Sequence, residues 1–326
     1  MLTIKYNDFV NENKEFADTS EGKSFIQEVI KFLSEKHEKS LEEAKKIVED
    51  YLDEIGDYFL LGVSAKTVAR KLFQETNEES INENVFNEDI QKYNHMIDYT
   101  QLDSTATQED ILGLTEKARI IEPASICILP KMVRFGKENL KDTDIMVCTV
   151  ISFPGGNNTI FQKLDETRQA ITDGADEIDM VLNYQLLKRK WDGDKVDEET
   201  EQYLLNDISQ LANICHRNNI TLKVIVESGL LDIQQTKYVT NLCLRCGADF
   251  IKTSTGKVAV GAELDKVRAM KDTIAEFGGT MFIKASGGIR TIEDIKKFYP
   301  YVDRFGIGWA AVDTMNGLGK ETKNNY

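Results

Sequence analysis

From residue 96 onward the chain repeats one unit, a short apolar run followed by a segment with helical spacing, and this repeat constrains the fold most. The first seven runs are rich in Val, Ile, Met and Phe and too continuous for half-exposed strands. Such runs are typical of a parallel sheet that is covered on its outer face. The expected strands are residues 96–102, 125–130, 146–152, 177–183, 221–228, 250–255, 281–286 and 304–308.

The intervening segments predict an outer layer of helices. Apolar residues recur there at helical spacing, at residues 108–120, 163–172, 198–216, 234–246, 264–275 and 292–298. Eight strand–helix units in roughly 230 residues match the usual size of a (β/α)₈ TIM barrel, an α/β fold. A doubly wound open sheet is the alternative. That fold normally has a glycine-rich fingerprint after its first strand, and Leu102-Asp103-Ser104-Thr105 is no such loop.

Residues 1–90 are expected to form a separate helical extension, and residues 91–326 the barrel with its C-terminal tail. Helical spacing covers residues 20–36 and 41–58, and Ser40 with Glu43 predicts a capping box before the second helix. A third helix is expected at 64–74, followed by a polar linker at 75–89. We expect this extension to pack on the barrel or a neighbouring subunit; an independent binding module is the alternative.

The composition of the chain argues against several classes of binding partner. The chain has 326 residues and a formal net charge of -15, which opposes binding to nucleic acid or to anionic membranes. The N-terminus has no apolar signal segment, and the five cysteines are an odd number, so we expect reduced thiols in a cytoplasmic protein. The three histidines lie far apart, and Cys243 and Cys246 have no second ligand pair, so no metal or other cofactor is expected.

Two lysines mark the candidate site. Lys252 and Lys284 each stand where an apolar run meets a small-residue turn, and these turns would be neighbours in the barrel. Two ammonium groups in one pocket are expected to lower each other's pKa, which would make one amine a nucleophile near neutral pH. This pattern predicts a Schiff-base enzyme.

Carboxylates on other strands strengthen this prediction. Asp179 lies within an apolar run, Asp98 lies beside Thr100, and Glu227 ends the fifth run. Any one of them could be a buried ion pair that braces the barrel. Several ionisable groups at the carboxyl ends of the strands together favour an active site, because that end carries catalysis in this fold.

Glycine turns predict an anion site at the same end. Backbone N–H groups of small-residue turns can point at a phosphate, and the loops after strands seven and eight often bind one. Arg290 adds positive charge nearby. A P-loop is excluded because its first glycine is absent and Val258 follows the lysine. The expected phosphate-binding residues are Gly256, Lys257, Gly287, Gly288, Gly306 and Gly308.

From residue 96 to the C-terminus the chain resembles the deoxyribose-phosphate aldolase family. The resemblance rests on IDYT at 97–100, ASICILP at 124–130, SFPGGN at 152–157, GADEIDMV at 174–181, LKVIVESG at 222–229, GADFIKTSTGK at 247–257 and KASGGIRT at 284–291. It implies a class I, metal-independent aldolase that reversibly cleaves 2-deoxy-D-ribose 5-phosphate to acetaldehyde and D-glyceraldehyde 3-phosphate. The extension before residue 90 lies outside it.

The resemblance also implies roles for single residues. Lys252 would form the Schiff base, Lys284 would lower the pKa of Lys252, and Asp179 would relay protons with Lys284. Substrate contacts are implied for Asp98, Thr100, Cys127, Thr253 and the terminal Tyr326. Small-molecule sugar phosphates and aldehydes are the expected partners, and a homodimer or higher homo-oligomer is compatible with them.

One turn departs from the family pattern. Family members usually carry hydroxyl residues after the eighth-strand glycine, whereas this chain has Gly308 and Trp309. Two side-chain donors to a phosphate are therefore missing, which leaves a related Schiff-base or transaldolase-like enzyme with altered phosphate preference as the alternative. A catalytically silent barrel with partner-binding N-terminal helices is the other alternative, and Lys252, Lys284 and Asp179 argue against it.

Overall fold

The computed structural model describes residues 19–36, 40–52, 68, 69, 72, 88–258 and 260–318. The chain divides into two compact units, Met1–Glu83 and Asn84–Tyr326, and each is treated by itself. Among the described helices, none combines the length and the apolar character that a bilayer span requires.

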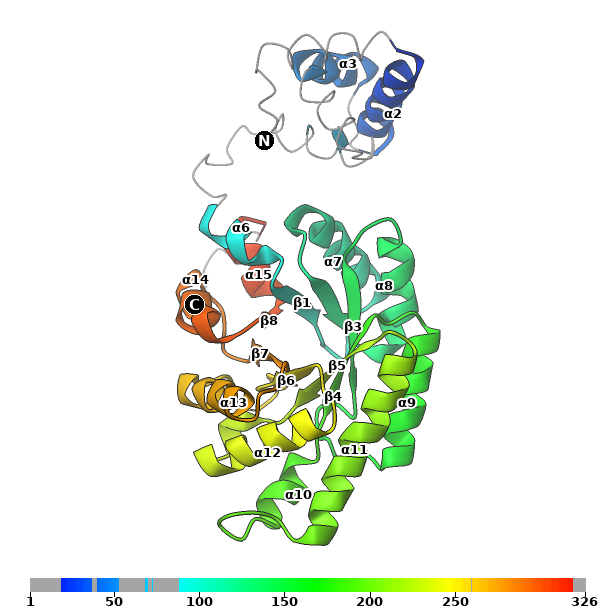
Figure 1. Ribbon diagram of the computed structural model, residues 1–326. Coiled ribbons are helices and arrows are strands. Elements are labelled where there is room, and N and C mark those ends of the chain that lie inside the picture. Colours follow the sequence, from blue (N-terminus) through cyan, green and yellow to red (C-terminus); the bar gives the residue numbers. More distant parts are fainter. Residues whose placement is uncertain are drawn as a thin grey trace. The chain divides into compact units, whose positions relative to one another are not determined.

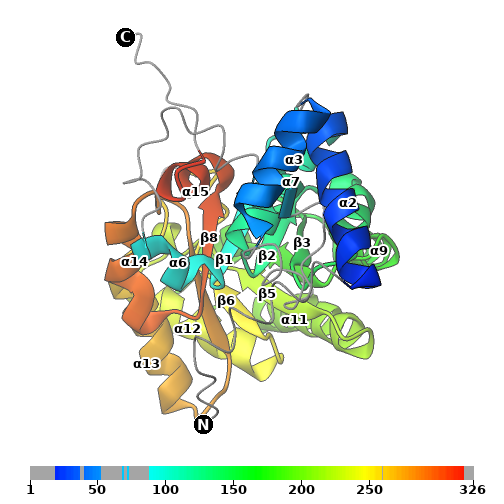
Figure 2. The same ribbon diagram turned by 90° about the horizontal axis from the view of Figure 1, so that it is seen from above.

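The second unit is a closed barrel of eight parallel strands in sequence order (Figures 1 and 2). Hydrogen bonds between β8 and β1 close the sheet, and the register aligns Asp98 with Gly306. The barrel confirms the predicted TIM-barrel class. Its strands are β1 Ile97–Gln101, β2 Ser125–Ile128, β3 Met146–Ile151, β4 Glu177–Val181, β5 Thr221–Ile225, β6 Phe250–Lys252, β7 Phe282–Ser286 and β8 Arg304–Gly308.

Helices cover the outside of these strands, as Figure 1 shows. Their apolar faces pack on the outward side chains of the sheet and form one continuous buried core with them. Each strand is followed by at least one helix; these are α7 Gln108–Ile121, α8 Val133–Leu140, α9 Ile160–Thr172, α10 Tyr184–Arg189, α11 Glu198–Arg217, α12 Ile233–Arg245, α13 Leu264–Glu276, α14 Ile292–Phe298 and α15 Trp309–Met315.

The six helices predicted from periodicity are present with bounds that shift by at most a few residues. Three further helices, α8, α10 and α15, were not predicted. They span 8, 6 and 7 residues, so a helical repeat has few positions in which to appear, although α14, with 7 residues, was predicted. A further short helix, α6 Glu88–Asn94, precedes β1 and begins inside the expected linker.

The first unit contains α2 Ser20–Lys36 and α3 Leu41–Asp50. The predicted capping box is present, because Ser40 Oγ accepts from the Glu43 backbone N–H and the Glu43 carboxylate accepts from the Ser40 backbone N–H. Apolar faces of both helices form a small core that includes Leu33 and Val48. Residues 53–58 of the second predicted helix, most of the third and most of the linker lie outside the described residues.

A buried ion pair ties the helical layer to the strand that carries Asp179. Lys163 on α9 and Asp207 on α11 are both fully buried and lie 2.5 Å apart. Lys163 Nζ also donates to the carbonyl of Val181, the last residue of β4, at 2.9 Å. Burial lowers the pKa of Lys163 and raises the pKa of Asp207, so each charge depends on the other.

Lys163→Met is expected to lower the free energy of unfolding of the barrel by about 3–5 kcal/mol, because it leaves a buried carboxylate without its cation. The double variant Lys163→Met/Asp207→Leu is expected to recover most of that loss, because no charge then remains in the interior. Urea denaturation followed by circular dichroism measures both. A single variant as stable as the parent would contradict the role given to this pair.

Candidate active site

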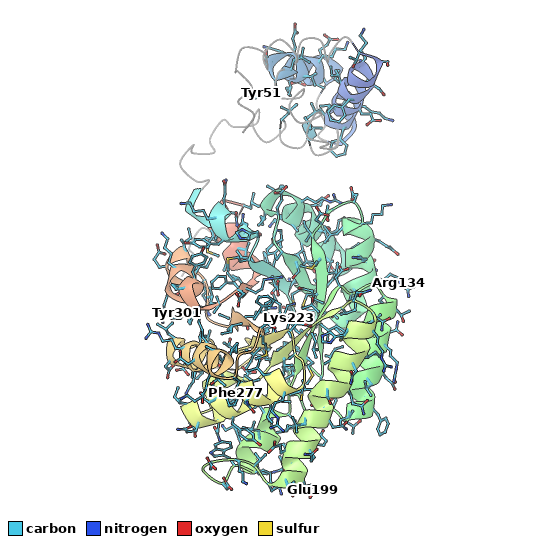
Figure 3. The ribbon with its side chains drawn as sticks, viewed as in Figure 1. Tyr51, Arg134, Glu199, Lys223, Phe277 and Tyr301 are labelled. Carbon is cyan, nitrogen blue, oxygen red and sulfur yellow. The ribbon has the colours of Figure 1, made fainter. Side chains whose placement is uncertain are left out.

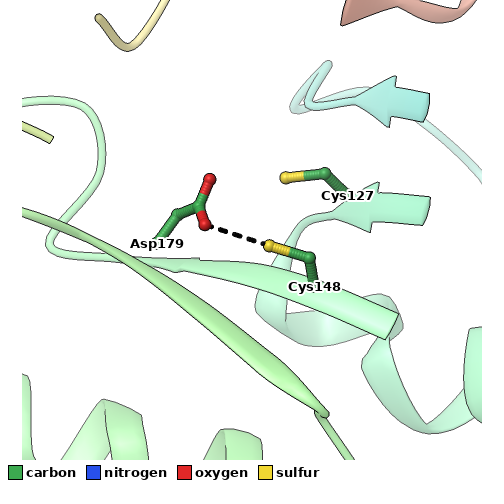
Figure 4. Close-up of side chains that lie close together, drawn as sticks. All are labelled: Cys127, Cys148 and Asp179. Atoms are coloured by element: carbon green, nitrogen blue, oxygen red, sulfur yellow. Dashed lines mark hydrogen bonds between the residues drawn. The ribbon is translucent and has the colours of Figure 1, made fainter. Parts of the chain in front are cut away.

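Asp179 on β4 is the centre of a buried ionic cluster inside the barrel. Its Oδ2 atom accepts from Lys252 Nζ at 2.7 Å and from Lys284 Nζ at 2.6 Å. Its Oδ1 atom lies 3.1 Å from Lys223 Nζ and accepts from the Cys148 thiol at 3.2 Å (Figure 4). The Asp179 carboxylate therefore contacts three lysines and one thiol, which come from four other strands.

A second set of ion pairs surrounds this centre. Lys223, which lies among the strands in Figure 3, contacts Glu177 at 2.6 Å. Arg304 donates to Asp98 at 2.6 Å and lies 3.4 Å from Glu177. Asp98 also pairs with Lys284. The cluster thus contains three carboxylates and four cations, and the register of neighbouring strands brings them to the same interior.

The charges in the cluster fix one another's protonation states. Burial opposes ionisation of Asp179, but Lys223, Lys252 and Lys284 outweigh it and hold the pKa of Asp179 well below its ordinary value. Burial also opposes the charge of Lys284, yet Asp179 and Asp98 raise its pKa well above the ordinary value. The prediction that both lysines have lowered pKa values is therefore wrong for Lys284, because two buried carboxylates outweigh the like charges nearby.

A cavity of about 500 Å³ opens above the cluster, within the range of small-molecule sites. Lys252 is the member of the Asp179 cluster that lines it, whereas Lys284 is fully buried beneath. Of the residues predicted from the sequence, the cavity is lined by Thr100, Lys252, Gly256, Lys257, Gly287, Gly288, Gly306 and Gly308. Arg290 and Trp309 line it as well.

Hydrogen bonds between loops shape the walls of this cavity. The buried Glu227 carboxylate accepts from the Thr255 hydroxyl at 2.7 Å and from its backbone N–H, which fixes the turn that carries Gly256 and Lys257. Ser286 Oγ donates to the Ser254 carbonyl at 2.5 Å. Gly287 has φ +84°, and its carbonyl oxygen lies where a Cβ on Gly261 would stand, so these turns require glycine. Burial raises the pKa of Glu227.

The remaining predicted residues have other positions. Thr253 is buried, and its hydroxyl donates to the Ser286 carbonyl at 3.0 Å. Cys127 is buried next to Cys148, and Asp98 is engaged by Lys284 and Arg304. Gly306 leaves space for Lys284, since a Cβ there would lie 3.1 Å from Lys284 Cε. Tyr326 lies outside the described residues.

Four members of the cluster were not singled out from the sequence: Cys148, Glu177, Lys223 and Arg304. A signal for one of them was present. Lys223 interrupts an apolar run between Leu222 and Val224, as Asp179 does in its own strand. A charge at an interior position of a barrel strand requires a partner, so Lys223 could have been paired with Asp179 in advance.

The fold is a (β/α)₈ barrel with a cavity and buried lysines at the carboxyl ends of its strands, which is where enzymes of this class carry their active sites. A match to the model of the DeoC/LacD family aldolases covers residues 90–301, so the chain belongs to this family and is a lyase. This confirms the resemblance found in the sequence.

Individual relatives of the chain are named as aldolases of the same family. The chain is 43% identical over 204 residues to the deoxyribose-phosphate aldolase of Metamycoplasma hominis, a match that covers 63% of this chain and 88% of the relative. It is 38% identical over 231 residues to that of Mycoplasma mobile, covering 71% and 100%. Among solved structures, the tetrameric deoxyribose phosphate aldolase of Aeropyrum pernix has a TM-score of 0.61 and 25% identity, covering 69% of this chain and 90% of that one.

Lys223→Met is expected to lower the free energy of unfolding by about 3–5 kcal/mol, because Glu177 and Asp179 then keep buried negative charge with fewer cations. Guanidinium denaturation measures the change. The matched control is Lys141→Met at the exposed end of α8, for which a change within about 0.5 kcal/mol is expected. Equal stability of the two variants would show that the cluster does not depend on Lys223.

Proposed function

We propose that the chain reversibly cleaves 2-deoxy-D-ribose 5-phosphate to acetaldehyde and D-glyceraldehyde 3-phosphate through a Schiff base on Lys252. The observation that carries the proposal is the position of Lys252, at the cavity wall and 2.7 Å from the carboxylate that Lys284 and Lys223 also contact. Membership of the aldolase family and the names of the relatives support the substrate.

Charge balance favours Lys252 as the nucleophile. The cluster contains one more cation than carboxylates, so neutralising one ammonium group relieves like-charge repulsion. Within the described residues Lys252 pairs with one carboxylate, whereas Lys284 pairs with two and Lys223 with three. Lys252 therefore loses the least attraction when it becomes the neutral amine that attacks a carbonyl.

The reaction follows from this arrangement. The Lys252 amine adds to the C1 aldehyde of the open-chain sugar, and loss of water gives a protonated imine. Its positive nitrogen accepts the electron pair of the C2–C3 bond as the C3 hydroxyl loses its proton, which releases D-glyceraldehyde 3-phosphate and leaves an enamine. Protonation of C2 and hydrolysis then release acetaldehyde and restore Lys252. Lys284 and the ionised Asp179 are the groups placed to move these protons.

The other end of the cavity is suited to a phosphate. Lys257 and Arg290 line it, and the turns at Gly256, Gly287 and Gly288 bring backbone N–H groups to the same region. Gly308 and Trp309 line it without hydroxyl donors. The lack of hydroxyl donors favours one variant of the proposal, in which the phosphate group contributes less to the binding free energy than its charge would suggest. In that variant other aldehydes are accepted as well.

We also propose a homo-oligomer in the cytoplasm as the working form. The tetrameric state of the Aeropyrum pernix relative supports self-association. The formal charge of -15 opposes partners such as nucleic acid or anionic lipid.

Borohydride reduction in the presence of deoxyribose 5-phosphate or acetaldehyde is expected to attach the substrate carbons to Lys252. Peptide mass spectrometry locates the adduct. Lys252→Ala is expected to lose about 10⁴-fold or more in kcat, as other enzymes do when a covalent nucleophile is removed. Trapping at another residue would overturn the assignment of the nucleophile.

Lys257→Met is expected to lower kcat/KM for deoxyribose 5-phosphate by about 10- to 100-fold, because a charged hydrogen bond contributes about 1.5–3 kcal/mol. The rate with unphosphorylated deoxyribose should stay nearly constant. Arg290→Met tests the second cation in the same way. Equal losses on both sugars would show that Lys257 does not act on the phosphate.

A further inference from the structure

Two cysteines face each other inside the barrel, directly beside the catalytic carboxylate. Cys127 on β2 and Cys148 on β3 are register partners, and both are fully buried. Their sulfur atoms and a carboxylate oxygen of Asp179 all lie within 4.8 Å of one another (Figure 4). Neighbouring strands lie about 4.7–4.9 Å apart, which is within the Cα separation of about 4.4–6.8 Å that disulfides span.

We propose that Cys127 and Cys148 are a dithiol modification site, which a peroxide oxidises to a disulfide across β2 and β3. Cys148 takes no part in the bond-making and bond-breaking steps proposed for the aldolase reaction, and the sequence analysis did not single it out.

The two thiols differ in pKa, as a peroxide-reactive pair requires. The neighbouring Cys148 side chain and the charges of Lys284 and Lys252 lower the pKa of the Cys127 thiol. Burial raises the pKa of Cys148 well above its ordinary value. Peroxide attacks thiolates, and a sulfenic acid next to a second thiol condenses with it. Cys127 is therefore the attacking thiol and Cys148 the resolving one.

The chemistry balances with peroxide as the only oxidant. The Cys127 thiolate attacks one oxygen of hydrogen peroxide, the O–O bond breaks, and sulfenic acid and hydroxide form; this hydroxide takes up the proton that Cys127 released on ionising and becomes the first water. The Cys148 sulfur then attacks the Cys127 sulfur, the S–O bond breaks, and the departing hydroxide takes the Cys148 proton to form water. Two thiols are oxidised by two electrons and one peroxide becomes two waters.

The surroundings favour this reaction over metal binding by the same atoms. Lys223 Nζ lies 3.5 Å from Cys148 Sγ and 3.1 Å from Asp179 Oδ1, and its positive charge repels a metal cation. A neutral, water-sized peroxide meets no such repulsion. The cavity comes close to the pair, because Thr100, the register partner of Cys127 on β1, lines it.

Closing the disulfide should stop turnover. The Cys148 thiol donates to Asp179 Oδ1 at 3.2 Å, and a sulfur in a disulfide has no proton to donate. Asp179 then shifts relative to Lys252 and Lys284, which both contact its other oxygen. A misplacement of about 1 Å in an active site can cost on the order of 10²-fold in rate.

The test treats the full chain with hydrogen peroxide and follows both intact mass and aldolase rate. The expected result is a loss of two hydrogens, a Cys127–Cys148 cross-linked peptide, a rate lowered on the order of 10²-fold, and recovery of mass and rate with dithiothreitol. Cys148→Ser and Cys148→Ala are both made, in case one fails to fold, and neither should form the cross-link. Cys246→Ser, on the partly exposed cysteine that follows α12, is the matched control and should still form it.

The mass readout needs no assumption about the substrate, whereas the rate readout depends on the proposed function. A cross-link without any enzyme activity in the untreated protein would leave the dithiol site standing and overturn the function. Sulfinic acid at Cys127 without a cross-link, or a cross-link between other cysteines, would overturn the dithiol site.

Discussion

The Asp179 carboxylate is the constraint on which the rest of the site depends. A fully buried negative charge is tolerated only with close cations and hydrogen bonds, and here Lys223, Lys252, Lys284 and the Cys148 thiol supply them. These partners come from β5, β6, β7 and β3, so the charge is stabilised only when these strands have assembled around β4. Folding and assembly of the active site are consequently one event, and the ion pair between Lys163 and Asp207 extends the same dependence into the helical layer.

Much of the fold and of the candidate site could be predicted from the sequence, because the signals for them lie within single segments of the chain. Apolar runs separated by helical spacing predicted all eight strands, and charges within or at the ends of those runs indicated Lys252, Lys284 and Asp179 at one end of the barrel, where they are in contact. The errors concern properties that arise between strands. The pKa of Lys284 depends on Asp98, which lies on β1, and the contact between Cys148 and Asp179 depends on the register of β3 against β4. Neither can be read from one segment.

The buried lysines affect the Cys127 thiol as well as the Lys252 amine. The positive charges that favour a neutral amine on Lys252 also favour a thiolate on Cys127, because losing a proton lowers the positive charge of the cluster in both cases. Where such charges and the neighbouring side chain outweigh burial, as they do at Cys127 but not at Cys148, they make a thiol more reactive. In this chain a second thiol stands at the register partner of the first, which turns that reactivity into a defined two-electron product rather than an open-ended oxidation.

The end of the cavity that we propose for the phosphate is held in place by other contacts than those around Lys252. Trp309 opens α15, and Asp313 of the same helix accepts from Tyr99 of β1 and pairs with Lys117. Lys117 also lies 5.7 Å from the centre of the Trp309 ring. These contacts fix Trp309 without touching Asp179, Lys252 or Lys284. Because the two ends share no ion pair among the described residues, the proposed function allows the accepted aldehyde to change without a change in the contacts of Lys252.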